Sequence, residues 1–556
     1  MNTASAEELL FLPLGGAGEI GMNLNLYGFG PPGYEDWLMI DLGVTFNDGE
    51  LPGIEVLMPN PEFIEDRKDR LLALIITHAH EDHLGAVQYL WPKLRCPIYA
   101  TPFTVSVLRR KLAETEFGSE VEINEVPLGA KLALGPFDLE WVTMTHSIPE
   151  PNAIALKTPL GTVFHTGDWK FDPGPVVGVP TDEKTLQRIG DEGALAVVCD
   201  STNVFTPGTT GSEADILDNL TDIIASCTGQ VAVACFASNV ARLETIATAA
   251  ARNDRNVVLA GRSLKRITDA ARENGYIKDV PSFLMEEDAG FLPDNKTLII
   301  CTGSQGEPRA ALARIAAEDH PRIVLNPGDT LIFSSRVIPG NERAIAELQA
   351  KFLRRDIHVI TAKDAMIHVS GHPARDELTR LYKHLRPEIS IPVHGELRHL
   401  TEHAKLARAC QVPHAIVNEN GGAVRLAPGA PSIIDYVPVG RLASDGNRLV
   451  PIQSEIVKSR TRAMWHGFAV LTVILDRDEV DEEMPISTAG LLEDEDDAIL
   501  DTVRLAVREA IHRLSPQAND ADDHTISEVA RIAARRTFRA LIDKRPITRV
   551  HLVRLD

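Results

Sequence analysis

The sequence predicts an α/β protein with a strand-rich host domain, an inserted parallel α/β domain and a small α/β module at the end of the chain. Two observations predict this layout. Short aliphatic segments broken by glycine-rich turns run from residue 10 to about 205, strand-then-helix units fill 206–365, and short strands then return. At 556 residues, the chain is also too long for one hydrophobic core.

Residues 1–205 are predicted to be the first part of the host domain. Segments such as LMIDLGVTF, LLALIITHAH and GTVFHTGDW are typical of short strands, and several of them end on ionisable residues. In α/β folds, the loops at strand ends converge on one edge and carry the chemistry. We therefore expect the functional residues of this domain at its strand ends.

Residues 206–365 predict a nested domain. Four units pair a strand with a helix, for example GQVAVACF with SNVARLETIATAAARN and TLIICTG with EPRAALARIAAE. Repeated units of this kind favour a parallel sheet covered by helices. Because short strands resume at HVSGHP and PEISIPVHGE, residues 366–450 are predicted to complete the host domain.

The end of the chain predicts a polar linker at 451–465 and a separate α/β module at 466–556. Within the module, GFAVLTVILD and ITRVHLVRL predict strands, with two helices between them. Thr525 and Glu528 have the spacing of a capping box at the start of the second helix. The module contains no evident catalytic cluster.

Composition narrows the classes of function. The net charge of −23 opposes binding to a polyanion unless a basic cleft is present, and five residues are candidates to line one: Arg262, Lys265, Arg266, Arg309 and Arg336. The sequence shows neither a leader pattern nor an apolar run of membrane-span length, so we expect a cytoplasmic protein without membrane association. Six scattered cysteines are expected to be reduced.

One stretch, THAHEDH, follows a buried strand and carries four potential metal ligands: His78, His80, Asp82 and His83. Imidazole and carboxylate groups bind divalent transition metals, and this spacing can direct two residues to one ion and two to a neighbour. A two-ion site needs further ligands, including a bridging carboxylate. Other strand ends supply three candidates: His146, Asp168 and His394. Each alone is more often structural, but jointly they supply what the first loop lacks.

Several longer motifs resemble known families. THAHEDHLG, THSIP, HTGDWK and PVHGE resemble the successive motifs of the metallo-β-lactamase fold. The nested block, with CDSTN at its entry and HVSGH at its exit, resembles the β-CASP nucleases, and PLGGAGEIGMN, FASNVARL, CTGSQGEP and FSSRVIPGNE are similar to the ribonuclease J family. The resemblance implies a metallo-β-lactamase αββα sandwich, an inserted β-CASP parallel α/β domain and a small C-terminal α/β domain.

The resemblance also implies a distribution of the ligands. One metal ion would be held by His78, His80 and His146 and a second by Asp82, His83 and His394, with Asp168 bridging them. The two ions would be Zn²⁺ or Mn²⁺, and Mg²⁺ is also compatible. Asp41, at the end of LMID, would orient the ligand loop, and capping of the turn before Gly43 is the alternative.

By the same resemblance, His372 would be the general acid, oriented by Asp200, and Asp82 would also be catalytic. A turn cap is the alternative role for Asp200. The run of His368, Val369, Ser370, Gly371 and His372 offers donors for phosphate oxygens and would bind a terminal 5′ phosphate. Arg262 and Ser263 are weaker candidates for an anion contact, with a plain turn as the alternative. Phe46 is a candidate for stacking on a base, with a core position as the alternative.

The implied activity is hydrolysis of single-stranded RNA from 5′ to 3′, with a preference for 5′-monophosphorylated ends and with internal cleavage as well. The implied setting is mRNA decay and rRNA maturation, in a homodimer or homotetramer with RNA-degradation partners. Two alternatives stay open: a small-molecule hydrolase of the same fold, and a non-catalytic assembly subunit. The inserted domain argues against the first, because a small substrate needs no lid of that size.

Overall fold

The structure, a computed structural model, describes residues 7–47, 49–338, 340–476, 479–493, 495–514 and 522–555. The chain divides into two compact units, Met1–Phe46 with Val56–Arg441 and Asn47–Glu55 with Leu442–Asp556. The inserted domain therefore shares a unit with its host. The domain limits that the sequence predicts stay predictions. The first predicted domain starts at residue 1 and the last ends at residue 556, and residues 1–6 and 556 lie outside the described residues.

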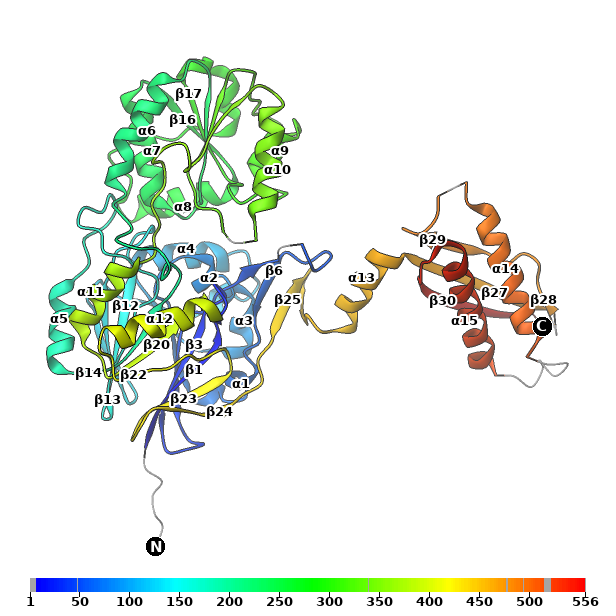
Figure 1. The fold of residues 1–556 in the computed structure, drawn as a ribbon, viewed down its shortest axis with the longest axis horizontal. Helices are drawn as coiled ribbons and strands as arrows, with labels where there is room; N and C mark the ends of the chain where they lie inside the picture. Colours follow the sequence, from blue (N-terminus) through cyan, green and yellow to red (C-terminus); the bar gives the residue numbers. More distant parts are fainter. Residues whose placement is uncertain are drawn as a thin grey trace, which may run out of the picture. The chain divides into compact units, whose positions relative to one another are not determined.

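Two large sheets enclose the main core of the first unit (Figure 1). One has the order β24 (Ser432–Tyr436), β23 (Gly422–Ala427), β1 (Glu8–Gly15), β3 (Leu24–Gly30), β4 (Asp36–Ile40), β7 (Leu71–Ile75), β8 (Ile98–Ala100) and β9 (Ile123–Glu125). The other has the order β10 (Lys131–Leu134), β11 (Phe137–Thr143), β12 (Asn152–Thr158), β13 (Gly161–His165), β14 (Ala194–Asp200), β20 (Ile389–Val393) and β22 (His414–Ala415). Phe11 and Ile75 from the first sheet join Trp141 and Ile391 from the second in one apolar cluster.

Helices cover the outer face of the second sheet. A further buried cluster joins its strands to α5 (Glu183–Glu192), α11 (Arg375–Leu385) and α12 (Leu397–Ala409), through residues such as Phe164, Leu381 and Leu406. In the chain, β7 is followed by α2 (Glu81–Leu84), α3 (Val87–Leu94) and α4 (Pro102–Leu112). This arrangement confirms the predicted mixed α/β sandwich.

The inserted domain contains a five-stranded sheet of order β16 (Asn256–Ala260), β17 (Thr297–Cys301), β15 (Val231–Ala234), β18 (Thr330–Phe333) and β19 (His358–Ile360). All of its strand pairs are parallel, as the strand-then-helix pattern predicts. The connecting helices are α6 (Ala214–Ser226), α7 (Val240–Arg252), α8 (Arg262–Glu273), α9 (Ala311–Ala316) and α10 (Glu342–Leu353) (Figure 1).

The second unit is built around β27 (Phe468–Asp476). This strand pairs with β28 (Glu479–Val480), β29 (Ile486–Ala489) and β30 (Ile547–Leu555), and α14 (Asp497–His512) and α15 (Asp523–Ile542) pack with this sheet in one core. The expected linker 451–465 contains most of α13 (Glu455–His466), which begins at a Ser454 cap.

Three smaller expectations can be compared with the structure. The predicted capping box is wrong, because α15 starts earlier and Asp522, not Thr525, caps it by accepting from the backbone N–H of Thr525 at 2.6 Å. All six cysteines are free, as expected. None of the helices among the described residues is long and apolar enough to cross a membrane.

Candidate metal centre and substrate site

The seven predicted ligands lie together at strand ends of the two sheets. The segment after β7 carries four of them, and His146, Asp168 and His394 follow β11, β13 and β20. They form two groups, one of His78, His80, His146 and Asp168 and one of Asp82, His83, Asp168 and His394. Within each group, one ligand atom per residue lies within 4.8 Å of the others. Asp168 belongs to both groups, which is the position of a bridging carboxylate.

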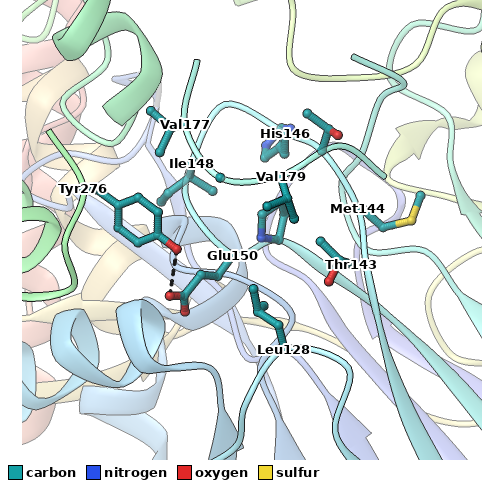
Figure 2. A pocket seen from close by; sticks show the side chains of 12 residues that line it. Leu128, Thr143, Met144, His146, Ile148, Glu150, Val177, Val179 and Tyr276 are labelled. Carbon is teal, nitrogen blue, oxygen red and sulfur yellow. Dashed lines mark hydrogen bonds between the residues drawn. The ribbon is translucent and has the colours of Figure 1, made fainter. Parts of the chain in front are cut away.

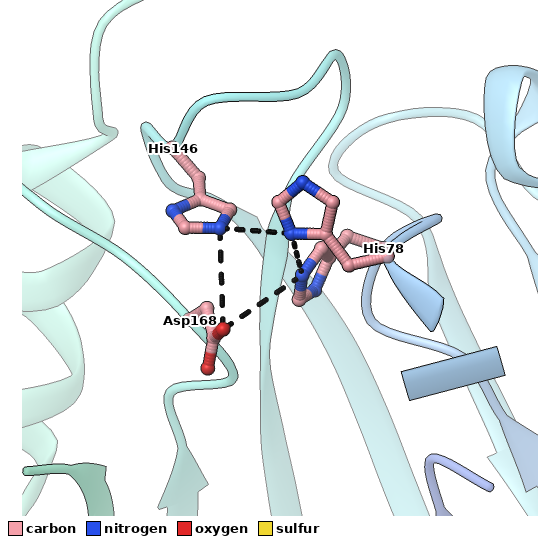
Figure 3. A group of neighbouring side chains, drawn as sticks. His78, His146 and Asp168 are labelled. Atoms are coloured by element: carbon pink, nitrogen blue, oxygen red, sulfur yellow. Dashed lines mark hydrogen bonds and ion pairs between the residues drawn. The ribbon is translucent and has the colours of Figure 1, made fainter. Parts of the chain in front are cut away.

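The first group presents three imidazole nitrogens to one point (Figure 3). Nδ1 of His80 lies 3.1 Å from Nε2 of His78 and 3.1 Å from Nε2 of His146. Nitrogen ligands of a tetrahedral ion lie roughly 3.3 Å apart, so this spacing fits a metal. Burial lowers the pKa of His80 to about 4 and those of His78 and His146 well below their usual value. These rings are therefore neutral at pH 7 and offer lone pairs.

The second group combines imidazole with carboxylate. Nε2 of His83 lies 3.2 Å from Oδ2 of Asp168, and Nε2 of His394 lies 3.1 Å from Oδ2 of Asp82. Burial disfavours the charged imidazoles, but the negative charge of Asp168 and its neighbours raises the pKa values of both histidines well above their usual value. The two carboxylates thus stabilise positive charge at this point, and a bound cation would supply such charge.

The far nitrogen of four ligand rings is held by a polar partner, and for His78 this partner is the Thr77 hydroxyl, 3.0 Å from Nδ1. Nδ1 of His83 donates to Asp41 at 2.7 Å, and Nδ1 of His146 donates to the backbone carbonyl of Gly371 at 2.7 Å. Nδ1 of His394 donates at 2.8 Å to the Thr202 hydroxyl. Each such bond fixes the orientation of the ring and leaves Nε2 as the nitrogen that faces the other ligands. For Asp41, this contact supports the orienting role over the turn cap.

His372 and Asp200 form a hydrogen-bonded pair beside the second group. Nδ1 of His372 lies 2.8 Å from Oδ2 of Asp200, whose side chain is fully buried. We call the seven predicted ligands together the metal cluster. A third possible ligand group consists of Asp168, Asp200, His372 and His394, so the pair lies close to this cluster. Burial opposes charge on His372, but Asp200 and Asp168 raise its pKa. The pair has the geometry of an acid and its orienting carboxylate.

The segment His368–His372 packs directly on the metal cluster. A Cβ atom at Gly371 would lie 2.5 Å from Cε1 of His146, so glycine is required for this packing. Nε2 of His368 is buried without a hydrogen-bond partner in the described part of the chain, and Val369 is buried. The sequence predicts Gly371 as a point of approach for a ligand, and the structure adds a close approach to His146, one of the predicted metal ligands.

Several predicted binding residues are not joined to the cluster. Among the described residues, no hydrogen bond or ion pair connects Arg262 or Ser263, both exposed at the start of α8, with the metal ligands. The N–H of Gly261 at this helix start already donates to the Glu286 carboxylate at 2.9 Å. Phe46 lies on the short strand β5 (Thr45–Phe46) and is 63% exposed.

A cavity of about 290 Å³ adjoins His146 (Figure 2). Met144, Ile148 and Val177 line it from the host domain, and Tyr276 lines it from the inserted domain. The Tyr276 hydroxyl donates to the Glu150 carboxylate at 3.0 Å, which ties the two domains together beside the cluster. The inserted domain thus reaches the cavity beside His146.

Sequence reasoning missed three polar residues of the site. Thr77 donates to Asp41 and accepts from His78, Thr202 connects His394 with Asp200, and Asn203 contacts the segment His368–His372. Their motifs, THAH and CDSTN, are visible in the sequence. The sequence around such a residue does not indicate which distant group its side chain will bond in the folded protein.

Four family descriptions match successive parts of the chain. Residues 33–215 match the metallo-beta-lactamase superfamily, and residues 228–351 match the ribonuclease J beta-CASP domain. Residues 356–417 match a Zn-dependent metallo-hydrolase RNA specificity domain, and residues 455–555 match the ribonuclease J C-terminal domain.

Whole-chain comparisons point the same way. A Ribonuclease J from Sinorhizobium meliloti is 44% identical over 555 residues, which cover 99% of this chain and 98% of that protein. A Ribonuclease J from Mycolicibacterium smegmatis is 39% identical over 469 residues, covering 84% and 83% of the two chains. A crystal structure of a protein of unknown function from Enterococcus faecalis is 16% identical, with a TM-score of 0.51 over 75% of this chain and 100% of that one, and shows similarity of fold alone.

Proposed function

The chain belongs to the ribonuclease J family and is a metal-dependent ribonuclease, and we propose that it degrades single-stranded RNA from the 5′ end. In this proposal, it favours a 5′-monophosphate and also cuts RNA internally. The observation that carries the proposal is the position of the segment His368–His372. Ser370, a donor for a terminal phosphate, stands two residues from His372, the acid beside the metal cluster. A phosphate held there lies close to the first internucleotide bond.

We propose that two divalent ions bind the two ligand groups, with Asp168 shared. The neutral nitrogens of the first group suit Zn²⁺ or Mn²⁺, and the carboxylate-rich second group suits Mn²⁺, Zn²⁺ or Mg²⁺. Such a pair of ions supplies Lewis-acid chemistry, which lowers the pKa of water and stabilises charge on the phosphate oxygens. The protein residues are then left with binding, orientation and proton transfer.

His372 is proposed to give a proton to the departing 3′ oxygen of the cleaved bond. Asp200 holds its Nδ1, so the other ring nitrogen is the one that transfers the proton. Asp82 is the more open carboxylate of the second group, 31% exposed against 3% for Asp168, and is proposed to take part in proton transfer as well as ligation. His368 and Ser370 are proposed to bind the terminal phosphate.

Neither alternative from the sequence is favoured. A small-molecule hydrolase of this fold has no use for the RNA specificity domain or the β-CASP domain that the chain matches. A non-catalytic subunit has no reason to keep seven converging ligands. We propose a cytoplasmic enzyme of mRNA decay and rRNA maturation, acting as a homodimer or homotetramer with RNA-degradation partners.

The experiment is product analysis on one RNA labelled at its 3′ end and carrying a 5′-monophosphate, a 5′-triphosphate or a 5′-hydroxyl. Release of mononucleotides with a shrinking 3′-labelled remainder, fastest for the monophosphate, is the expected result with Mn²⁺ or Mg²⁺ present. Turnover of a chromogenic β-lactam without RNA cleavage would overturn the proposal. A parallel DNA oligonucleotide measures selectivity for RNA.

A further inference from the structure

We infer that Asn203 is a positioning residue that presets two donors, the Ser370 hydroxyl and the Arg336 guanidinium, for the 5′-terminal phosphate of RNA. The inference rests on the proposed function, because it concerns the recognition of that phosphate. Asn203 lies in the loop after β14, which ends at Asp200, and the same loop carries Thr202. It is 2% exposed, so all its contacts are with the protein.

The orientation of the Asn203 amide follows from its partners. Its Nδ2 lies 2.9 Å from the backbone oxygen of His372, which can only accept, and its Oδ1 receives a hydrogen bond from Arg336, which can only donate. A flipped amide would place donor against donor and acceptor against acceptor. The second Nδ2 hydrogen therefore points to Ser370 Oγ, at 2.8 Å.

This orientation decides what Ser370 can do. Its oxygen accepts from Asn203 at 2.8 Å and from the backbone N–H of His372 at 3.2 Å, which uses both lone pairs. Its own hydrogen remains as a donor. A phosphate oxygen is an acceptor, so Asn203 holds Ser370 in the form that binds phosphate.

Arg336 is held at the same place from the inserted domain. Its guanidinium donates to Asn203, and its backbone oxygen accepts from Gln305 at 2.8 Å. The residue is exposed, and its planar guanidinium has N–H groups besides the one that donates to Asn203, in a geometry that suits a phosphate. One buried amide thus aligns a donor from each side of the domain boundary within the first unit.

The test compares kcat/KM for 5′-monophosphorylated and 5′-hydroxyl RNA of one sequence in wild type, Asn203→Ala and Asn203→Asp. Asn203→Asp keeps the volume and an acceptor for Arg336, but it draws the Ser370 hydrogen inward. We expect both variants to lose roughly 10- to 100-fold on the monophosphate and less than about threefold on the hydroxyl substrate. Their metal content should equal that of wild type.

The matched control is Asn253→Ala, because the Asn253 amide donates to the backbone oxygens of Thr221 and Ala249, and neither residue belongs to the site. It should keep the wild-type preference for the monophosphate. Equal losses on both substrates in the Asn203 variants, or an unchanged preference, would overturn the inference alone. A wild-type enzyme that degrades both RNAs equally would overturn the proposed 5′ preference and the inference with it.

Discussion

At the scale of single residues, Asp41 shows how the fold prepares a metal ligand. Its carboxylate is fully buried and its backbone has a φ of +64°, a conformation that few side chains adopt. It accepts from the backbone N–H of Thr77 at 2.8 Å and from Nδ1 of His83 at 2.7 Å. The strained backbone is thus tied to a hydrogen bond that selects one tautomer of His83.

Asp41→Asn should weaken metal binding at the second group. The amide would place an N–H against Nδ1 of His83, which favours the tautomer whose Nε2 carries the hydrogen and cannot bind a metal. We expect a loss of roughly 10- to 100-fold in affinity for one of two ions, measured by competition with a chelating dye. Asp36→Asn, at an exposed ion pair with Arg70, is the control and should change nothing. Unchanged affinity in Asp41→Asn would contradict the orienting role.

His80→Ala should abolish RNA hydrolysis and leave the fold largely intact. His80 supplies the nitrogen that faces both His78 and His146, yet it is only partly buried. Activity assays, thermal unfolding and metal analysis test this together. We expect a lost activity, a similar unfolding temperature and a lower metal content. Retained hydrolysis would exclude the first group as part of the active site.

His372→Ala should slow the chemical step more than it weakens RNA binding. Loss of a general acid costs about 10²- to 10⁴-fold in rate. Single-turnover rates and binding to uncleaved RNA separate the two effects, and Asp200→Asn should slow the rate in the same direction. Equal losses of binding and rate in His372→Ala would remove the acid assignment.

Much of the site could be predicted from the sequence, and the reason is chemical. His, Asp and their spacing at strand ends indicate a metal, so His78 through His394 could be chosen as candidates. Thr202 and Asn203 could not, because their partners His394 and Ser370 are set by the packing of distant segments. Arg262 and Ser263 are candidates because they begin a helix, but the Glu286 carboxylate already accepts from the backbone N–H of Gly261 there.

At the scale of elements, one buried histidine joins three of them beside the site. His403 of α12 lies 2.9 Å from Ser201 Oγ, after β14, and 2.8 Å from the hydroxyl of Tyr382 in α11. Burial lowers the pKa of His403 to about 4. The folded protein therefore holds this ring neutral where the unfolded chain, with a pKa of about 6.5, binds a proton.

The contribution of His403 to stability should be present above pH 6.5 and lost as pH falls toward 4. Between these values the unfolded chain binds the extra proton, so the free energy of unfolding decreases by roughly 3 kcal/mol. Urea unfolding of wild type and His403→Gln at pH 7, 6, 5 and 4.5 measures this. The variant should show a shallower dependence, and His414→Gln, at an exposed position, should match wild type. Parallel curves for His403→Gln and wild type would contradict the prediction.

The secondary structure was predictable where its pattern is long. The strand-then-helix units of the inserted domain appear as a parallel sheet because alternation of the two periods is a strong signal. Helix ends were less predictable. Asp522 caps α15 although Thr525 and Glu528 have the spacing of a capping box, since Glu528 pairs instead with Arg531.

At the scale of the whole molecule, the net charge of −23 and an RNA substrate are compatible because charge is local. Near the segment His368–His372, which we propose binds the terminal phosphate, Nη1 of Arg242 lies 3.4 Å from Nδ1 of His368, and Arg336 contacts Asn203. Arg242 is also paired with Glu213, so it orders the segment more than it attracts RNA. The net charge of the protein therefore sets the long-range repulsion of RNA, whereas a few hydrogen-bond donors near the segment His368–His372 determine how the RNA phosphate is bound.

The account depends most on the claim that seven side chains bind two cations. Crystals of the full chain soaked in Mn²⁺ and measured at the manganese absorption edge test it directly. We expect two anomalous peaks about 3.5–4 Å apart, one among His78, His80 and His146 and one among Asp82, His83 and His394, with Asp168 between them. A peak remote from these residues, or no peak at a saturating metal concentration, would contradict the account.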